Sequence, residues 1–220
     1  MTSKAEIQSR VFLQARNITK YPLDLEEVVK TLQMSKHVKI IYDYTLDDEI
    51  DAYLYESKRR LYIVVNGHRP PERQRFTIAH EIGHLYIGHE PVRINGWDMH
   101  EDYQEDEAND FAAGLLMPAS RVYTLAEHHR NVLQLLEVVK KYFDVSLAAA
   151  AKRITNLDIF RGAILLKDRA GQNTYFNYRT SDFYDDNEYR FYHEKKLPGN
   201  KLLHVLVAET YRHVVRWEIG

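Results

Sequence analysis

Cysteine is absent from the 220 residues of the chain. Its absence excludes a disulfide framework, a zinc site built on thiolates, iron–sulfur ligation and a cysteine nucleophile. Any metal site must therefore be built from His, Asp and Glu, and the chain contains 11 His.

An excess of charge of one sign is also missing. The sequence has 30 Lys+Arg and 32 Asp+Glu, which gives a net charge of −2, so no global basic field indicates nucleic-acid binding. No apolar run approaches the roughly 18 residues of a membrane span, and the first residues lack the apolar stretch of a secretion signal. We therefore expect a cytoplasmic protein that does not associate with a membrane.

Hydrophobic residues make up 45% of the chain, which is typical of globular domains. Helical and strand-like patterns succeed one another in blocks, and this order predicts an α+β fold. Helices are expected at residues 4–16, 24–34, 72–88, 104–117 and 121–157, the last one interrupted at Asp144. Strands are expected at residues 38–44, 52–55, 61–65, 163–166 and 174–178, whereas 202–219 fits either type.

The expected helix 72–88 contains the motif H-E-x-x-H, formed by His80, Glu81 and His84. Residues four apart stack on one helix face, so the two imidazoles would point at one zinc ion. Glu81 lies further round the helix, where it would act as the general base of a hydrolase. Gly83 would let another element pack closely. The same spacing also arises by chance, but a preceding strand, an apolar opposite face and the carboxylates that follow favour a metal site.

A hydrolytic zinc site usually has three protein ligands, so one more is expected. His89 lies five residues after His84, beyond the expected end of the helix. The next helix has a carboxylate near its apolar stripe, and on a helical wheel Glu105 lies nearer to that stripe than Glu107 does. Glu105 is therefore the expected third ligand and Glu107 the alternative. The stripe consists of Ala108, Phe111, Ala112 and Leu115.

Asn109 lies one turn after Glu105, where its side chain would hydrogen-bond a metal ligand. One zinc ion per chain is the expected cofactor, with manganese as the alternative, because a His/His/Glu set accepts several divalent ions. A group that stabilises the oxyanion is also expected, and the sequence leaves it open among residues such as His100 and Tyr103.

Two stretches together resemble the ImmA/IrrE family of zinc metallopeptidases. They are R-F-T-I-A-H-E-I-G-H at 75–84 and E-x-x-A-N-D-F-A-A-G-L-L-M-P at 105–118, and the resemblance extends over roughly residues 5–157. It implies a zincin-like fold with gluzincin-type ligands His80, His84 and Glu105 and the catalytic base Glu81. It also implies that the substrates are helix-turn-helix transcriptional repressors, cleaved at one site to release mobile-element or stress-response genes.

Three segments are expected: a zincin-like metallopeptidase domain at 1–125, a helix-turn-helix-like segment at 126–158 and a β-rich segment of unassigned role at 159–220. Ser146 is the expected N-cap of the second helix of the middle segment. Local positive charge comes from Lys140, Lys141, Lys152 and Arg153. These few residues do not form the clustered patch of a phosphate-binding surface, so direct DNA binding is not favoured over packing or substrate contact.

The sequence thus predicts a zinc-dependent, site-specific endopeptidase that hydrolyses one bond of a helix-turn-helix repressor. The alternative is a non-enzymatic regulator that binds DNA or a repressor and holds a structural metal, and a third candidate is a general peptidase. Glu81 favours an enzyme, since a purely structural site needs no base beside its ligands. We further expect the strand at 61–65 to bind the substrate backbone by strand addition.

Overall fold

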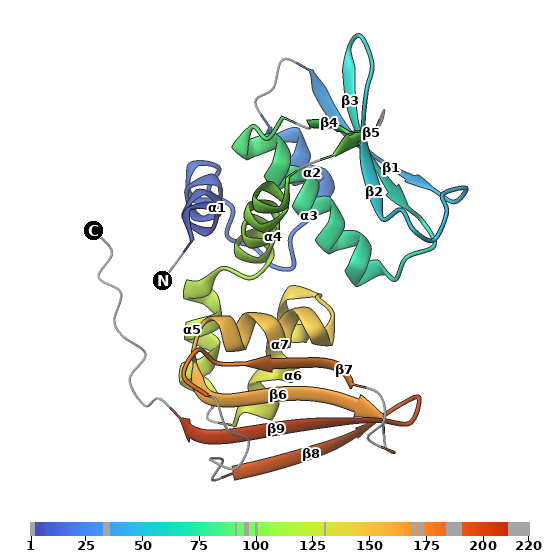
Figure 1. Cartoon of the computed structure of the whole chain (residues 1–220). Coiled ribbons are helices and arrows are strands. Elements are labelled where there is room, and N and C mark those ends of the chain that lie inside the picture. Colours follow the sequence, from blue (N-terminus) through green and yellow to red (C-terminus); the bar gives the residue numbers. More distant parts are fainter. Residues whose placement is uncertain are drawn as a thin grey trace. The chain divides into compact units, whose positions relative to one another are not determined.

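The computed structural model describes residues 3–32, 36–90, 92–94, 97–99, 101–129, 131–168, 170, 174–183 and 191–210. The elements confirm the predicted α+β architecture (Figure 1). The chain divides into two compact units, Met1–Pro118 with Phe143–Val145, and Ala119–Tyr142 with Ser146–Gly220. The expected segments 126–158 and 159–220 both fall largely within the second unit, and the division into three segments stays a prediction.

The first unit combines helices with a small mixed sheet (Figure 1). Its helices are α1 (Lys4–Ala15), α2 (Leu25–Lys30), α3 (Pro71–Ile87) and α4 (Asp102–Leu116). Its strands are β1 (His37–Asp43), β2 (Ala52–Glu56), β3 (Arg60–Asn66), β4 (Val92–Ile94) and β5 (Trp97–Met99). Asp24 caps α2, because its carboxylate accepts a hydrogen bond from the Glu27 backbone N–H, and this helix is shorter than predicted.

The strand order β1-β3-β2 places β3 at the centre of the three-stranded sheet. β1 runs parallel to β3 and β2 runs antiparallel to it, so both edges of β3 are already paired. The expectation that residues 61–65 add a substrate strand is therefore wrong. The free edges belong to β1 and β2, and β2 is the edge strand that contacts α3.

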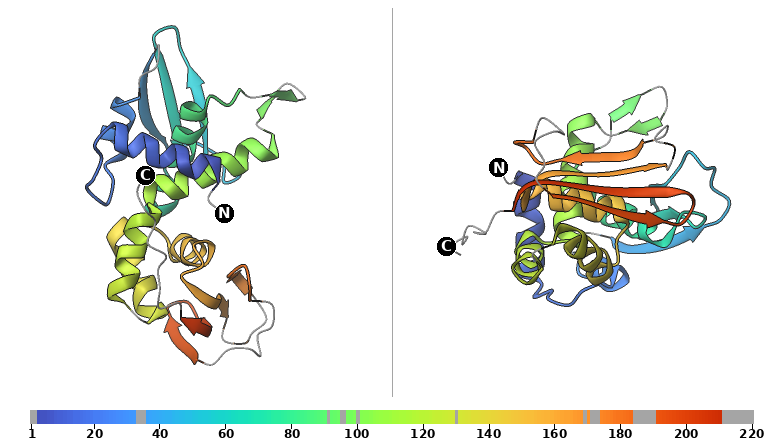
Figure 2. Two further views of the ribbon diagram at one scale, coloured as in Figure 1. Left: turned by 90° about the vertical axis from the view of Figure 1, so that its left-hand side faces the viewer. Right: turned by 90° about the horizontal axis from the view of Figure 1, so that it is seen from below.

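Helix α4 packs against both α3 and α1, which cross it in close contact (Figure 2). Two glycines allow these crossings. A Cβ atom on Gly83 of α3 would lie 3.2 Å from the Ala108 backbone oxygen, and one on Gly114 of α4 would lie 2.2 Å from Ser9 Oγ of α1. The predicted apolar stripe of α4 (Ala108, Phe111, Ala112 and Leu115) is fully buried. The core thus fixes the rotation of α4 about its axis, which decides where its carboxylates point.

The second unit consists of helices and a four-stranded antiparallel sheet in the order β7-β6-β9-β8 (Figure 2). The helices are α5 (Ala119–His128), α6 (Val132–Phe143) and α7 (Leu147–Asn156). The strands are β6 (Phe160–Asp168), β7 (Thr174–Arg179), β8 (Phe191–Leu197) and β9 (Lys201–Thr210). The stretch 202–219, which the sequence left open, is a strand as far as Thr210, and its remainder lies outside the described residues.

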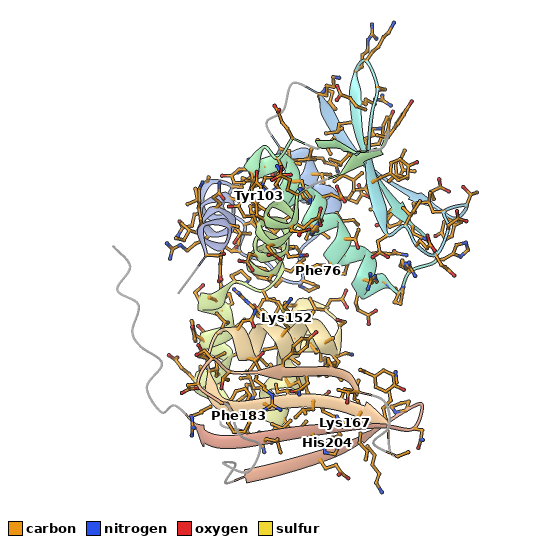
Figure 3. The ribbon with its side chains drawn as sticks, in the orientation of Figure 1. Phe76, Tyr103, Lys152, Lys167, Phe183 and His204 are labelled. Carbon is orange, nitrogen blue, oxygen red and sulfur yellow. The ribbon has the colours of Figure 1, made fainter. Side chains whose placement is uncertain are left out.

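The helix expected at 121–157 is interrupted at Asp144, as predicted, and also before Val132. Asp144 has a φ of 53°, and Ser146 caps α7 by accepting a hydrogen bond of 3.1 Å from the Ala149 N–H. Arg153, one of the four residues that give this segment its local positive charge, is buried and only 5% exposed, so it does not add to an exposed basic surface. Lys141 and Lys152 are exposed (Figure 3 labels Lys152), and they are too few to indicate DNA binding.

The structure predicts that Gly162→Ala strongly destabilises the second unit. A Cβ atom at Gly162 would lie 1.9 Å from the Leu206 backbone oxygen, where β6 carries a bulge against β9. Relieving this overlap requires the paired strands to separate, so we expect the free energy of unfolding to fall by more than about 3 kcal/mol in urea titrations.

Gly199→Ala is the matched control, since Gly199 also has a positive φ, of 68°, but its Cβ would meet no atom within 4 Å. This substitution should cost only about 1–2 kcal/mol of backbone strain. Equal losses for the two variants would show that the overlap at Gly162 does not exist in the folded protein.

None of the helices in the described part of the chain combines the length and the apolar character needed to cross a bilayer.

Candidate metal centre

Helix α3 carries His80 and His84 one turn apart on the same face. The helix begins at Pro71, whose fixed φ suits the first helical turn, and its opposite face buries Ala79 and Ile82 in the core. This anchoring leaves both imidazoles pointing toward α4. Both rings are well covered, since the side chain of His80 is 14% exposed and that of His84 is 1% exposed.

Three possible ligand atoms converge between α3 and α4. His80 Nε2 lies 2.9 Å from His84 Nε2 and 3.1 Å from Glu105 Oε2, and His84 Nε2 lies 3.4 Å from Glu105 Oε1. Ligands at 2.0–2.1 Å around a tetrahedral zinc ion lie about 3.3 Å apart. The donor set and its spacing therefore fit one zinc ion. Among the described residues, His80, His84 and Glu105 form the group that could hold a metal, with ligand atoms all within 4.8 Å of one another.

Glu105 reaches this cluster because α3 and α4 approach closely at Gly83. The glycine packs against Ala108, one turn after Glu105, and a larger side chain there would push the helices apart. The burial of the α4 stripe turns Glu105 toward the histidines, as the helical wheel predicted. The alternative ligand Glu107 points elsewhere, and its Oε2 lies 3.0 Å from His89 Nε2.

Asn109 lies beside the cluster, where the sequence placed it. Its Oδ1 is 3.0 Å from His80 Nδ1, so with Nε2 turned to a metal the ring can donate its Nδ1–H to the amide oxygen. Of the two residues suggested to stabilise the oxyanion, the structure describes one. His100 lies outside the described residues, and Tyr103 is 57% exposed at the start of α4 (Figure 3).

His89 contacts the cluster, although its sequence position lies beyond the expected end of the helix. His89 Nδ1 lies 2.9 Å from His84 Nδ1. The cause is Gly88, which ends α3 with a φ of 83° and turns the chain back, so that the His89 N–H donates to the His84 carbonyl. A glycine directly after a helical run was the available signal, because it commonly marks such a reversal.

Comparisons with known proteins decide the family. Residues 33–155 match the model of a peptidase family described as the IrrE N-terminal-like domain. This match covers more than half of the chain. The chain belongs to this IrrE-like family. The resemblance to ImmA/IrrE proteins is thereby confirmed.

Two curated relatives of this IrrE-like chain are named radiation response metalloprotease IrrE. The protein from Deinococcus deserti is 35% identical over 97 residues, which cover 40% of this chain and 34% of the relative. The protein from Deinococcus radiodurans is 32% identical over 101 residues, which cover 42% of this chain and 30% of the relative. The matched stretch thus amounts to about a third of the length of each relative.

A solved structure of a Mycobacterium tuberculosis transcriptional regulator also resembles this IrrE-like chain. The TM-score is 0.57 at 16% sequence identity, and the match covers 82% of this chain and 56% of that protein. At this identity the likeness concerns the fold alone.

Glu81 is the remaining titratable group of the IrrE-like site. Burial, together with the negative charge of Glu105, raises its pKa to about 7. A carboxylate whose pKa lies near neutral pH can both accept and return a proton. Burial thus favours protonated Glu81 in the metal-free protein, and a bound cation would shift it toward the carboxylate that a general base must be.

The raised pKa of Glu81 predicts that the metal-free protein loses stability as pH rises. The folded state binds this proton more tightly than the unfolded chain, whose Glu81 titrates near 4.5, so the stabilisation is present below pH 4.5 and is lost as pH rises toward 7. Relative to Glu81→Gln, the metal-free wild type should lose about 2–3 kcal/mol between pH 5 and pH 8 in urea titrations.

Added zinc should abolish most of this pH dependence, because a nearby cation favours the ionised carboxylate. If the metal-free wild type and Glu81→Gln show the same dependence of stability on pH, folding does not raise the pKa of Glu81.

Proposed function

We propose that the chain is a zinc-dependent endopeptidase of zincin-like fold, with His80, His84 and Glu105 as the metal ligands and Glu81 as the general base. The observation that carries the proposal is the convergence of three ligand atoms from two helices, with a partly buried carboxylate next to one of the ligands in the chain. Membership of a peptidase family and the names of the curated relatives support it.

A divalent metal in this cluster supplies the Lewis acidity that polarises a scissile carbonyl. The chain's own groups supply the rest. Glu81 accepts a proton from the attacking water and passes it to the leaving amine. Asn109 accepts the Nδ1–H of His80 and so holds that ring with Nε2 toward the metal.

The free edge of β2 is the place where a substrate strand could add beside α3. Asp51 and Ser57 hydrogen-bond across to Asn66 and Arg60, and the pairing continues in register between them. Residues whose backbone bonds to the partner strand alternate with residues whose backbone does not, so the N–H and C=O groups of residues 52, 54 and 56 face away from β3. Leu54→Pro removes one outward N–H and no sheet hydrogen bond, so it should weaken cleavage without unfolding the protein. Unchanged cleavage by folded Leu54→Pro would exclude this edge.

The substrate class that we propose is a helix-turn-helix transcriptional repressor, cut at one site. The test incubates the zinc-loaded full chain with a panel of such repressors, starting with any encoded beside its gene, and with casein as an unfolded protein. Intact-mass spectrometry should show one cut in a repressor, no cut in casein, and loss of cleavage after chelation. Degradation of casein at many sites would favour a general peptidase, and no cleavage at all would favour the non-enzymatic regulator.

A further inference from the structure

The two ring nitrogens of His84 have different neighbours. Nε2 faces His80 and Glu105 in the candidate metal site, whereas Nδ1, on the other side of the ring, lies 2.9 Å from His89 Nδ1. His89 in turn places its Nε2 3.0 Å from Glu107 Oε2. A continuous chain of hydrogen-bonding groups thus runs from Glu107 through His89 to His84.

The geometry admits one arrangement of protons when Nε2 of His84 binds a metal. The free nitrogen of a neutral, metal-bound imidazole carries the hydrogen, so His84 Nδ1 is the donor and His89 Nδ1 must be the unprotonated acceptor. His89 is then neutral, with its hydrogen on Nε2, which it donates to the Glu107 carboxylate. In this arrangement each of the two contacts, His84 to His89 and His89 to Glu107, joins one donor to one acceptor.

These contacts lie in a covered part of the molecule. The side chain of His89 is 5% exposed, that of His84 is 1% exposed and that of Glu107 is 32% exposed. Water therefore has little access to His84 Nδ1, and a hydrogen bond there is not readily replaced by solvent. The turn at Gly88 holds the backbone of His89 on that of His84, because the His89 N–H donates to the His84 carbonyl at 3.0 Å.

We propose that His89, held by Glu107, is a positioning residue that fixes the tautomer and ring orientation of His84 for metal binding. The proposal rests on the proposed function, since it requires that His84 Nε2 is a ligand. Groups that accept the free N–H of a metal-bound histidine orient its ring and raise its basicity, and their loss commonly costs 10- to 100-fold in metal affinity. His80 has a comparable arrangement, because its Nδ1 lies 3.0 Å from the acceptor Asn109 Oδ1.

His89→Leu tests this role because leucine fills space without accepting a hydrogen bond. The zinc Kd of the full chain, measured by competition with a chelating dye, should rise about 10- to 100-fold. His89→Gln keeps an acceptor for His84 and a donor for Glu107, so it should bind zinc more tightly than His89→Leu. Glu107→Ala should weaken binding in the same direction but less, because it removes only the outer group.

Asp106→Asn is the matched control, since Asp106 is exposed on the same helix next to Glu107, and its zinc Kd should stay within about twofold of wild type. Thermal melts of each metal-free variant show whether it folds, and the visible spectrum of the Co²⁺-loaded protein shows whether the coordination changes. We expect His89→Leu to alter that spectrum and Asp106→Asn to leave it unchanged.

The outcomes separate this inference from the proposed function. A wild-type protein that binds no zinc would overturn both. The positioning role alone would be overturned if the wild type binds zinc and folded His89→Leu has the same zinc Kd and the same Co²⁺ spectrum. A lowered melting temperature of His89→Leu would then mark His89 as merely structural. If His89→Leu does not fold, the comparison of Glu107→Ala with Asp106→Asn decides, and equal zinc affinities of these two variants would refute the role.

Discussion

Replacing Glu81 by Gln is expected to lower kcat for peptide cleavage by about 10²- to 10⁴-fold, the usual contribution of a general acid–base group. The amide keeps the size of the carboxylate but cannot accept the proton of the attacking water at neutral pH. The substitution leaves the proposed ligands His80, His84 and Glu105 untouched, so we expect one zinc ion per chain to remain bound. Quantified cleavage products and metal analysis of the same preparation measure both effects.

The control for this substitution is Glu72→Gln, in the first turn of the same helix, α3. It makes the same chemical change away from the ligand cluster and should leave kcat within about twofold of wild type. A Glu81→Gln protein that retains both metal and cleavage would remove Glu81 from the mechanism. A Glu81→Gln protein that loses its metal would instead place this residue in the coordination sphere.

Glu105→Ala is expected to raise the zinc Kd by about 10²- to 10³-fold. Zinc held by four protein ligands is bound with roughly 10–16 kcal/mol, so one ligand contributes on the order of 3–4 kcal/mol. Among the residues that the structure describes, loss of Glu105 leaves the two imidazoles as the possible ligands, since Glu107 points to His89 instead. Competition with a chelating dye measures the change.

Comparison with Glu107→Ala decides between the two carboxylates that the sequence singled out. We expect the loss of zinc affinity to be clearly smaller for Glu107→Ala than for Glu105→Ala. A larger loss in Glu107→Ala would mean that α4 is rotated about its axis in solution relative to this structure.

The elements around the site were predictable because their patterns are local and strong. Helices α3 and α4 carry apolar residues at helical spacing, and their observed bounds differ from the expected ones by one or two residues. Glu105 could be chosen over Glu107 from the helical wheel alone, because the apolar stripe of α4 had to be buried and Glu105 lies nearer to it. The position of Asn109 followed from the same wheel.

What the sequence did not reveal depends on contacts between distant segments or on a single backbone angle. The central position of β3 is a matter of strand order, which periodicity does not encode. The burial of Arg153 depends on how α7 packs in its unit. The place of His89 depends on the left-handed conformation of Gly88, because a continued helix would have carried its ring away from His84.

Zinc K-edge X-ray absorption of the zinc-loaded full chain examines the proposed centre most directly. We expect a shell of nitrogen and oxygen atoms at about 2.0–2.1 Å with the outer scattering of two imidazoles, from His80 and His84. A spectrum that requires three imidazoles would make His89 a ligand rather than a positioning residue. A purified protein that takes up no zinc would contradict the proposed zinc site.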